Sequence, residues 1–161
     1  MRFFKTVLYI LAVLVLQTVV FPRLNFMGVI PDLFLVSVVA FAVLAERTPA
    51  TNHDGSWPVT LFSAFSAFLQ DVLSTGIYFN TILKVVIGNV VCSIKERFIG
   101  DEYFLAAGMV LIFSPLYLFL TDGVIHFHFL YFVFRVVATT IYNLLMVLLL
   151  FPIVKVIARG D

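Results

Sequence analysis

The chain has 161 residues, of which 63% are hydrophobic and only 12% are charged, and its mean hydropathy is +1.14. A soluble domain is about half apolar and about a quarter charged, so this composition excludes an ordinary soluble protein and indicates an integral membrane protein. The formal net charge of +1, with basic residues scattered along the chain, gives no indication of nucleic-acid binding. The single cysteine, Cys92, excludes an intramolecular disulfide.

Six apolar segments separated by short polar stretches predict an all-α, polytopic membrane protein with a single transmembrane domain of six helices. The predicted spans are approximately residues 6–21, 31–45, 58–73, 79–94, 102–120 and 129–157. Pro22 ends the first span. Pro31 and Asp32 begin the second, because proline suits the first helical position and an acid in the first turn suits the helix dipole. Pro115 predicts a kink in the fifth span.

The basic residues outside the predicted helices indicate how the spans are oriented. If the N-terminus lies inside, the inner segments contain seven basic residues, and the outer loops contain only Arg23. The seven are Arg2, Lys5, Arg47, Lys95, Arg97, Lys155 and Arg159. Inner loops of membrane proteins carry an excess of Lys and Arg, so this bias predicts that both termini are cytoplasmic.

Charged residues within the helices gather in the outer half of the predicted bundle. Asp71 and Lys84 are placed symmetrically about the turn between the third and fourth helices, so we expect them to face each other at one depth. Asp32, Arg135 and Asp122 share this half. A charge at the bilayer centre costs about 2.5–3.5 kcal/mol, which favours paired charges that are structural or form a binding site. Alternatively, the bases extend to the outer interface and the acids cap helices.

Small and polar residues recur at helical spacing and predict faces that point into the bundle. The stripes are Asn80, Lys84 and Gly88; Arg135, Thr139 and Asn143; and Ser63, Ser66, Ala67, Gln70, Asp71 and Ser74. Because small residues let helix backbones approach closely, Ser63, Ala67 and Gly88 are predicted helix-packing positions. Gln17 adds a polar group from the outer half of the first helix.

The sequence does not contain a recognisable catalytic or metal-binding motif. His126 and His128 lie two residues apart in the last predicted outer loop, but no Cys, Asp or Glu is placed to complete a zinc site. No His-Glu-x-x-His motif, nucleophile elbow or phosphate-binding glycine loop is present. We therefore expect a protein that is not an enzyme and that carries no metal or cofactor.

Two stretches resemble the MreD family of bacterial rod shape-determining membrane proteins. The first is Gly28-Val-Ile-Pro-Asp32-Leu at the start of the second helix, and the second is Leu69-Gln70-Asp71-Val-Leu at the end of the third. The length, the six-span hydropathy and the short basic tail also agree. The chain departs from the family where Ser63 and Ala67 stand near positions that usually carry glycine.

The resemblance implies a non-enzymatic scaffold of the cell-wall elongation complex in the bacterial cytoplasmic (inner) membrane. Expected partners are the lipid bilayer and a bitopic MreC-like protein and, through it, MreB, RodA and a penicillin-binding transpeptidase. The resemblance also implies a fold like that of the substrate-binding subunits of energy-coupling-factor transporters. The alternative function is therefore a solute-binding subunit of a vitamin-type transporter, with Asp32, Asp71, Lys84 and Arg135 lining a pocket open to the outside.

Overall fold

The computed structural model describes residues 2–25, 28–45, 57–74, 79–121 and 129–159. Within these residues the chain forms six α-helices and no β-strand, which confirms the predicted all-α fold. The helices are α1 (Arg2–Val15), which continues into a π-helical turn η1 (Leu16–Val20), α2 (Leu33–Leu44), α3 (Trp57–Ser74), α4 (Phe79–Lys95), α5 (Glu102–Thr121) and α6 (Phe129–Arg159). Each helix overlaps one of the six predicted apolar segments.

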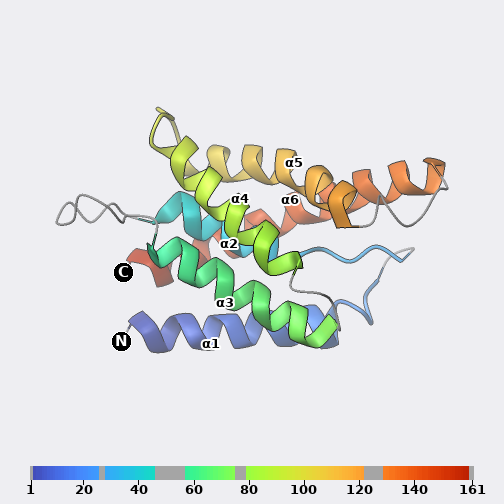
Figure 1. Ribbon diagram of the computed structural model, residues 1–161, viewed down its shortest axis with the longest axis horizontal. Coiled ribbons are helices and arrows are strands. Elements are labelled where there is room, and N and C mark those ends of the chain that lie inside the picture. Colours follow the sequence, from blue (N-terminus) through green and yellow to red (C-terminus); the bar gives the residue numbers. More distant parts are fainter. Residues whose placement is uncertain (1, 26–27, 46–56, 75–78, 122–128, 160–161) are drawn as a thin grey trace.

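Successive helices run in opposite directions, so that the N- and C-termini lie at the same end of the bundle (Figure 1). We call this the termini end. The opposite end, where η1 leads towards α2, α3 towards α4 and α5 towards α6, is called the distal end (Figure 1). Six antiparallel helices return the chain to its starting end.

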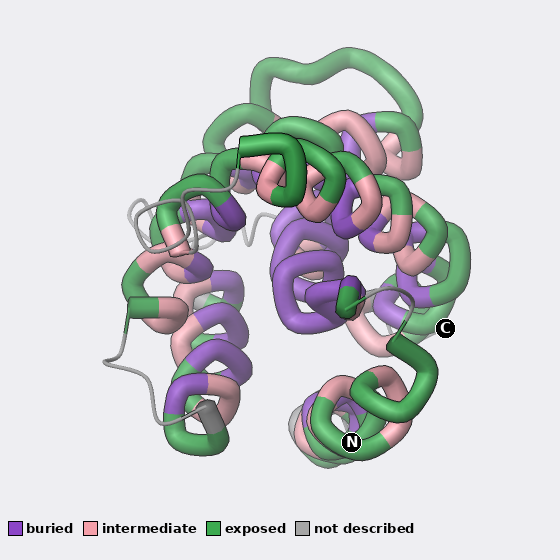
Figure 2. Tube along the Cα trace, turned by 90° about the vertical axis from the view of Figure 1, so that its right-hand side faces the viewer, coloured by how far each residue is buried: buried purple, intermediate pink, exposed green. Residues whose placement is uncertain are grey.

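Helix α2 forms the centre of the bundle and contacts all five other helices. Every residue of α2 except Phe41 is buried, and Figure 2 shows the buried helix surrounded by helices whose outer sides are exposed. A helix that is apolar on all sides needs neighbours on all sides. Its 12 residues extend over only about 18 Å at about 1.5 Å per residue, so this central helix is shorter than the helices around it.

The start of α2 differs in detail from the expectation. The helix begins at Leu33, and Asp32 is the N-cap residue rather than a member of the first turn. The Asp32 Oδ1 atom accepts a hydrogen bond from the Leu35 amide at 2.9 Å, which satisfies one of the amides left without a partner at a helix N-terminus. Gly28, four residues before, has a φ of 80°, a backbone conformation that favours glycine.

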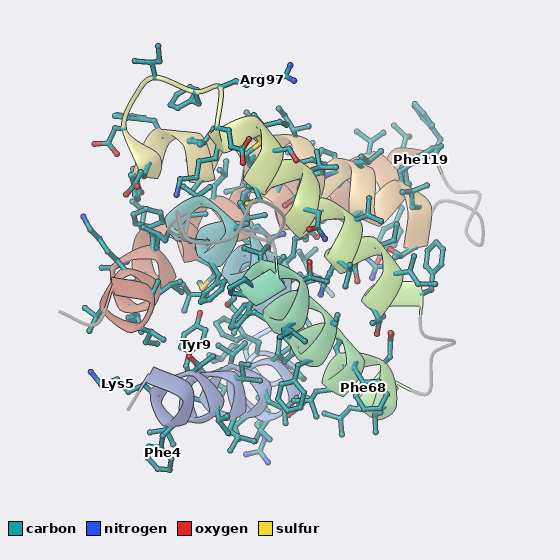
Figure 3. The ribbon with its side chains drawn as sticks, turned by 60° about the vertical axis from the view of Figure 1, so that its left-hand side comes forward. Phe4, Lys5, Tyr9, Phe68, Arg97 and Phe119 are labelled. Carbon is teal, nitrogen blue, oxygen red and sulfur yellow. The ribbon has the colours of Figure 1, made fainter. Side chains whose placement is uncertain are left out.

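The outward faces of the helices are strongly apolar. Leu61 of α3, Ile112 of α5 and Leu149 of α6 are 60%, 59% and 60% exposed. Figure 3 shows Phe4 and Phe119 pointing away from the bundle, whereas Tyr9 points between the helices. Two helices, Glu102–Thr121 and Phe129–Ala158, are long and apolar enough to cross a membrane, judged by length and composition. These features indicate that the protein associates with a membrane.

Helices α3 and α4 approach each other closely at Gly88. A Cβ atom added at Gly88 would lie 2.6 Å from the Ser63 Oγ atom and 3.3 Å from methyl groups of both Val38 and Val59. Ser63 and Ala67 are completely buried on the facing side of α3. The space at Gly88 is therefore filled by α2 and α3, and only glycine fits without a shift of the neighbouring atoms.

A buried ion pair beside a polar cavity

The Lys84 side chain is completely buried, and all three of its N–H donors have acceptors. Its Nζ atom lies 2.8 Å from both carboxylate oxygens of Asp32, and it also donates to the Gln70 Oε1 atom. The rings of Phe34 and Tyr117 lie 5.6 Å and 5.1 Å from Nζ, measured to their centroids. Aromatic faces at this distance attract a cation. The ammonium group is thus enclosed by partners from α2, α3 and α5.

The residues around Asp32 hold its carboxylate in place. The Asp32 amide donates to the Asn143 Oδ1 atom of α6 at 2.7 Å, and the Leu33 amide donates to the Gln17 Oε1 atom of η1 at 2.8 Å. Asn143 in turn donates to the Ser114 Oγ atom of α5 at 2.9 Å. The buried N-terminus of α2 therefore receives side-chain partners from two other elements, which take the place of the water that binds an exposed helix end.

Asp71 takes a different role from the one that its spacing to Lys84 predicts. Lys84 forms its ion pair with Asp32, so the expected Asp71–Lys84 pair is replaced. Asp71 Oδ2 instead accepts hydrogen bonds from the Thr81 amide at 2.8 Å and from the Thr81 Oγ1 atom at 2.6 Å. Asp71 is buried and ties the end of α3 to the first turn of α4. The spacing identifies the two helices that meet but not the acid that reaches Lys84.

A cavity of about 260 Å³ lies next to the ion pair, at the distal end of the bundle. It is lined mainly by polar side chains from η1, α3, α4, α5 and α6 and by the segment that precedes α2. The lining residues are Gln17, Ile30, Asp32, Gln70, Asn80, Ser114, Tyr117, Leu118, Thr121, Arg135, Thr139 and Asn143. A polar cavity that draws residues from so many elements has the capacity to hold another molecule.

The structure brings together most of the residues that the sequence singles out. The stripe of Arg135, Thr139 and Asn143 lines the cavity, and Arg135 is half-buried there without being part of the Lys84 ion pair. Asn80 also lines the cavity and accepts a hydrogen bond from the Tyr117 hydroxyl. Asp122, His126 and His128 lie outside the described residues.

Among the polar residues of the site, the sequence pattern does not identify Thr81, Ser114, Tyr117 and Thr121. Ser114 and Tyr117 lie three residues apart in α5, a spacing that places both on one helix face and that could have indicated a polar contact. Thr81 stands next to Asn80 in the first turn of α4, where hydroxyls commonly bind nearby polar groups. In each case the signal is a lone hydroxyl in an apolar segment.

Among the described residues, no group of three or more His, Cys, Asp or Glu side chains could hold a metal ion. The ammonium of Lys84 has no donor left for a substrate, because its two Asp32 contacts and its Gln70 contact use all three. The geometry therefore suits packing and the binding of a small polar group. Neither a family model, nor a curated protein, nor a solved structure matches this chain.

Proposed function

We propose that this chain is a six-span, non-enzymatic membrane scaffold of the MreD type, acting in the cell-wall elongation complex of a bacterial cytoplasmic membrane. The observation that carries the proposal is the meeting of the two stretches that resemble the family. Asp32 comes from the first stretch and Gln70 from the second, and both bind the same Lys84 ammonium. The resemblance thus falls on residues that hold the helices together.

The outward faces of the helices support a membrane environment for the whole bundle. Large apolar side chains are exposed on every helix except the buried α2. Pro31 and Asp32, directly before α2, are non-helical and buried, which is tolerated at membrane depth only where protein groups satisfy the backbone. Here Asn143 and Gln17 satisfy the amides of Asp32 and Leu33. With the basic segments inside, the termini end faces the cytoplasm and the cavity faces outwards.

In this proposal the apolar outer faces bind lipid and the single transmembrane helix of an MreC-like partner. MreB, RodA and a penicillin-binding transpeptidase join the complex through that partner.

The test is affinity purification of the tagged chain in mild detergent from a rod-shaped host, together with depletion of the chain. We expect an MreC-like protein to co-purify and depleted cells to become round. If no such partner co-purifies and the depleted cells stay rod-shaped, the scaffold function is wrong.

The cavity favours a second candidate, a solute-binding subunit of a vitamin-type transporter. A partly open, polar cavity at the outer end of the bundle is what such a subunit requires. Native mass spectrometry of the purified chain distinguishes the candidates, because a transporter subunit should carry a stoichiometric small molecule. A scaffold should instead carry its protein partner.

A further inference from the structure

The orientation of two glutamine side chains determines which atoms they present to the cavity. Gln17 Oε1 accepts from the Leu33 amide, and Gln70 Oε1 accepts from the Lys84 ammonium. A backbone amide and an ammonium can only donate, so these bonds identify the oxygen of each glutamine without ambiguity. The NH₂ groups of Gln17 and Gln70 donate to no residue in the described part of the chain, and both side chains line the cavity.

Asn80 of α4 adds a third amide, but its partner is a tyrosine hydroxyl, which can accept as well as donate and so does not by itself identify the oxygen. Its Oδ1 atom accepts from the Tyr117 hydroxyl, and its NH₂ group makes no hydrogen bond with any described residue. Three primary amides from η1, α3 and α4 thus present donors to one cavity. Arg135 of α6 lines the same cavity and adds a positive charge.

The amide oxygens and the carboxylate of the cavity, in contrast, already bind protein donors. The amide oxygens of Gln17, Gln70, Asn80 and Asn143 all accept hydrogen bonds from protein donors. The Asp32 carboxylate is neutralised by Lys84 at 2.8 Å. The free NH₂ donors and the positive charge of Arg135 therefore favour a ligand that brings mainly acceptors over a sugar or other polyol, which also brings O–H donors. An oxyanion brings acceptors only.

The volume restricts the size of the ligand. At about 260 Å³ the cavity is slightly below the range of about 300–1,000 Å³ that is typical of small-molecule sites. It fits a compact anionic group with a few attached atoms. From the donors, the engaged acceptors and the volume, we propose that the cavity binds a phosphate oxyanion, held by the amides of Gln17, Gln70 and Asn80 and by the Arg135 guanidinium. The inference deepens the second candidate function and does not depend on the scaffold function.

Two sources could supply this phosphate group: a water-soluble anion and the headgroup of a lipid. The test uses the full chain purified in a non-ionic detergent, with ionic strength held constant by chloride. Inorganic phosphate and short-chain phosphatidylglycerol are titrated separately, with glucose as a neutral probe, and thermal unfolding is followed by circular dichroism. A ligand that binds only the folded state raises Tm with its concentration. We expect phosphate or phosphatidylglycerol, but not glucose, to raise it.

Gln17→Glu and Gln70→Glu test the donors directly. Each keeps the oxygen that Leu33 or Lys84 requires and replaces the NH₂ donor with an oxygen that repels an anion. Loss of one hydrogen bond to a charged group should weaken binding by at least about tenfold. Asn25→Asp is the matched control, because Asn25 is exposed, does not line the cavity, and lies in the segment that follows η1 at the distal end. It should bind as the wild type does.

Each outcome decides the proposal. A response to inorganic phosphate identifies a soluble ligand, and a response to phosphatidylglycerol alone identifies a headgroup. No response to either probe, or equal weakening by Asn25→Asp, overturns the proposal. If the glutamate variants fail to fold, Asn80→Asp removes the third NH₂ donor and keeps the oxygen that the Tyr117 hydroxyl binds, and unchanged binding by it overturns the proposal too. A co-purified neutral solute would overturn the oxyanion but keep the second candidate function.

Discussion

The two ends of α2 satisfy their unpaired backbone groups in different ways. At the distal end its first amides and its capping acid are buried, and they are bound by Gln17, Lys84 and Asn143 from three other elements. At the termini end the half-buried Lys95 of α4 donates to the Ala45 carbonyl at 2.8 Å. A lysine near a helix C-terminus binds the last carbonyls and suits the helix dipole.

The difference follows from access to water. A helix end near the surface can exchange a protein partner for water at little cost, whereas a buried end must take every partner from the protein. The distal end therefore concentrates polar residues in an apolar chain, and its contacts should be energetically coupled. The termini end should tolerate single changes. The following predictions test that contrast, beginning with the largest expected effect.

Removal of the buried ammonium should cause the largest loss of stability. Lys84→Met leaves the Asp32 carboxylate buried without its partner, and breaking a buried ion pair in this way costs about 3–5 kcal/mol. The free energy of unfolding in detergent micelles measures this loss. Lys95→Met is the control at the other end of α2 and should cost about 1 kcal/mol or less, because Lys95 remains partly exposed.

A second substitution separates loss of the pair from loss of packing. Asn at position 32 remains a good N-cap and removes the charge, so Lys84→Met with Asp32→Asn should recover at least about half of the lost free energy. If the double variant is as unstable as Lys84→Met alone, the ion pair is not the source of the effect. If Lys95→Met is as damaging as Lys84→Met, the contrast between the two ends is wrong.

The close contact between α3 and α4 should be the next most sensitive position. Gly88→Ala places a Cβ atom 2.6 Å from the Ser63 Oγ atom, and such overpacking costs about 1–3 kcal/mol. Gly108→Ala is the matched control, because nothing lies within 4 Å of the added atom, and alanine favours a helix by about 1 kcal/mol over glycine. Unfolding of the two variants under the same conditions should give shifts of opposite sign.

Ser63→Ala tests whether the Ser63 Oγ atom causes the overpacking in Gly88→Ala. The Ser63 Oγ atom is buried and makes no hydrogen bond within the described residues, so its removal should cost little. Combined with Gly88→Ala, it removes the atom that the new methyl group would meet first, and it should restore much of the stability. Additive losses in the double variant would show that Ser63 is not the obstacle.

The sequence predicts the helices well, because long apolar segments bounded by proline and charge leave few alternatives. It also places Asn80, Lys84 and Gly88 correctly on one inward face, since a spacing of four residues fixes a helix face whatever the neighbours are. The pairing of Lys84 depends instead on which helices are adjacent in space. Asp71 is closer in the sequence, but α2 lies at the centre of the bundle, and Asp32 at its N-cap reaches the ammonium.

The cavity could not be predicted for a related reason. Its polar character depends on which end of each amide already has a partner, and the partners of Gln17 and Gln70 come from segments 16 and 14 residues away. Sequence periodicity shows that these residues face inwards. It does not show that their oxygens are engaged and their NH₂ groups are available.

The smallest predicted effect compares two acids that bind backbone amides at the starts of helices. Asp71 is buried and binds the Thr81 amide and hydroxyl, whereas Asp101 is exposed and binds the Tyr103 amide at 2.7 Å at the start of α5. Loss of a capping acid costs about 0.5–2 kcal/mol. We expect Asp71→Ala to fall at the upper end and Asp101→Ala at the lower end, because water can replace only the exposed contact. Equal losses in micelle unfolding would mean that burial does not distinguish the two ends of the bundle.

Thr81→Val, which removes the hydroxyl but keeps the amide, should account for part of the Asp71 loss and not add to it, because both substitutions remove the same hydrogen bond.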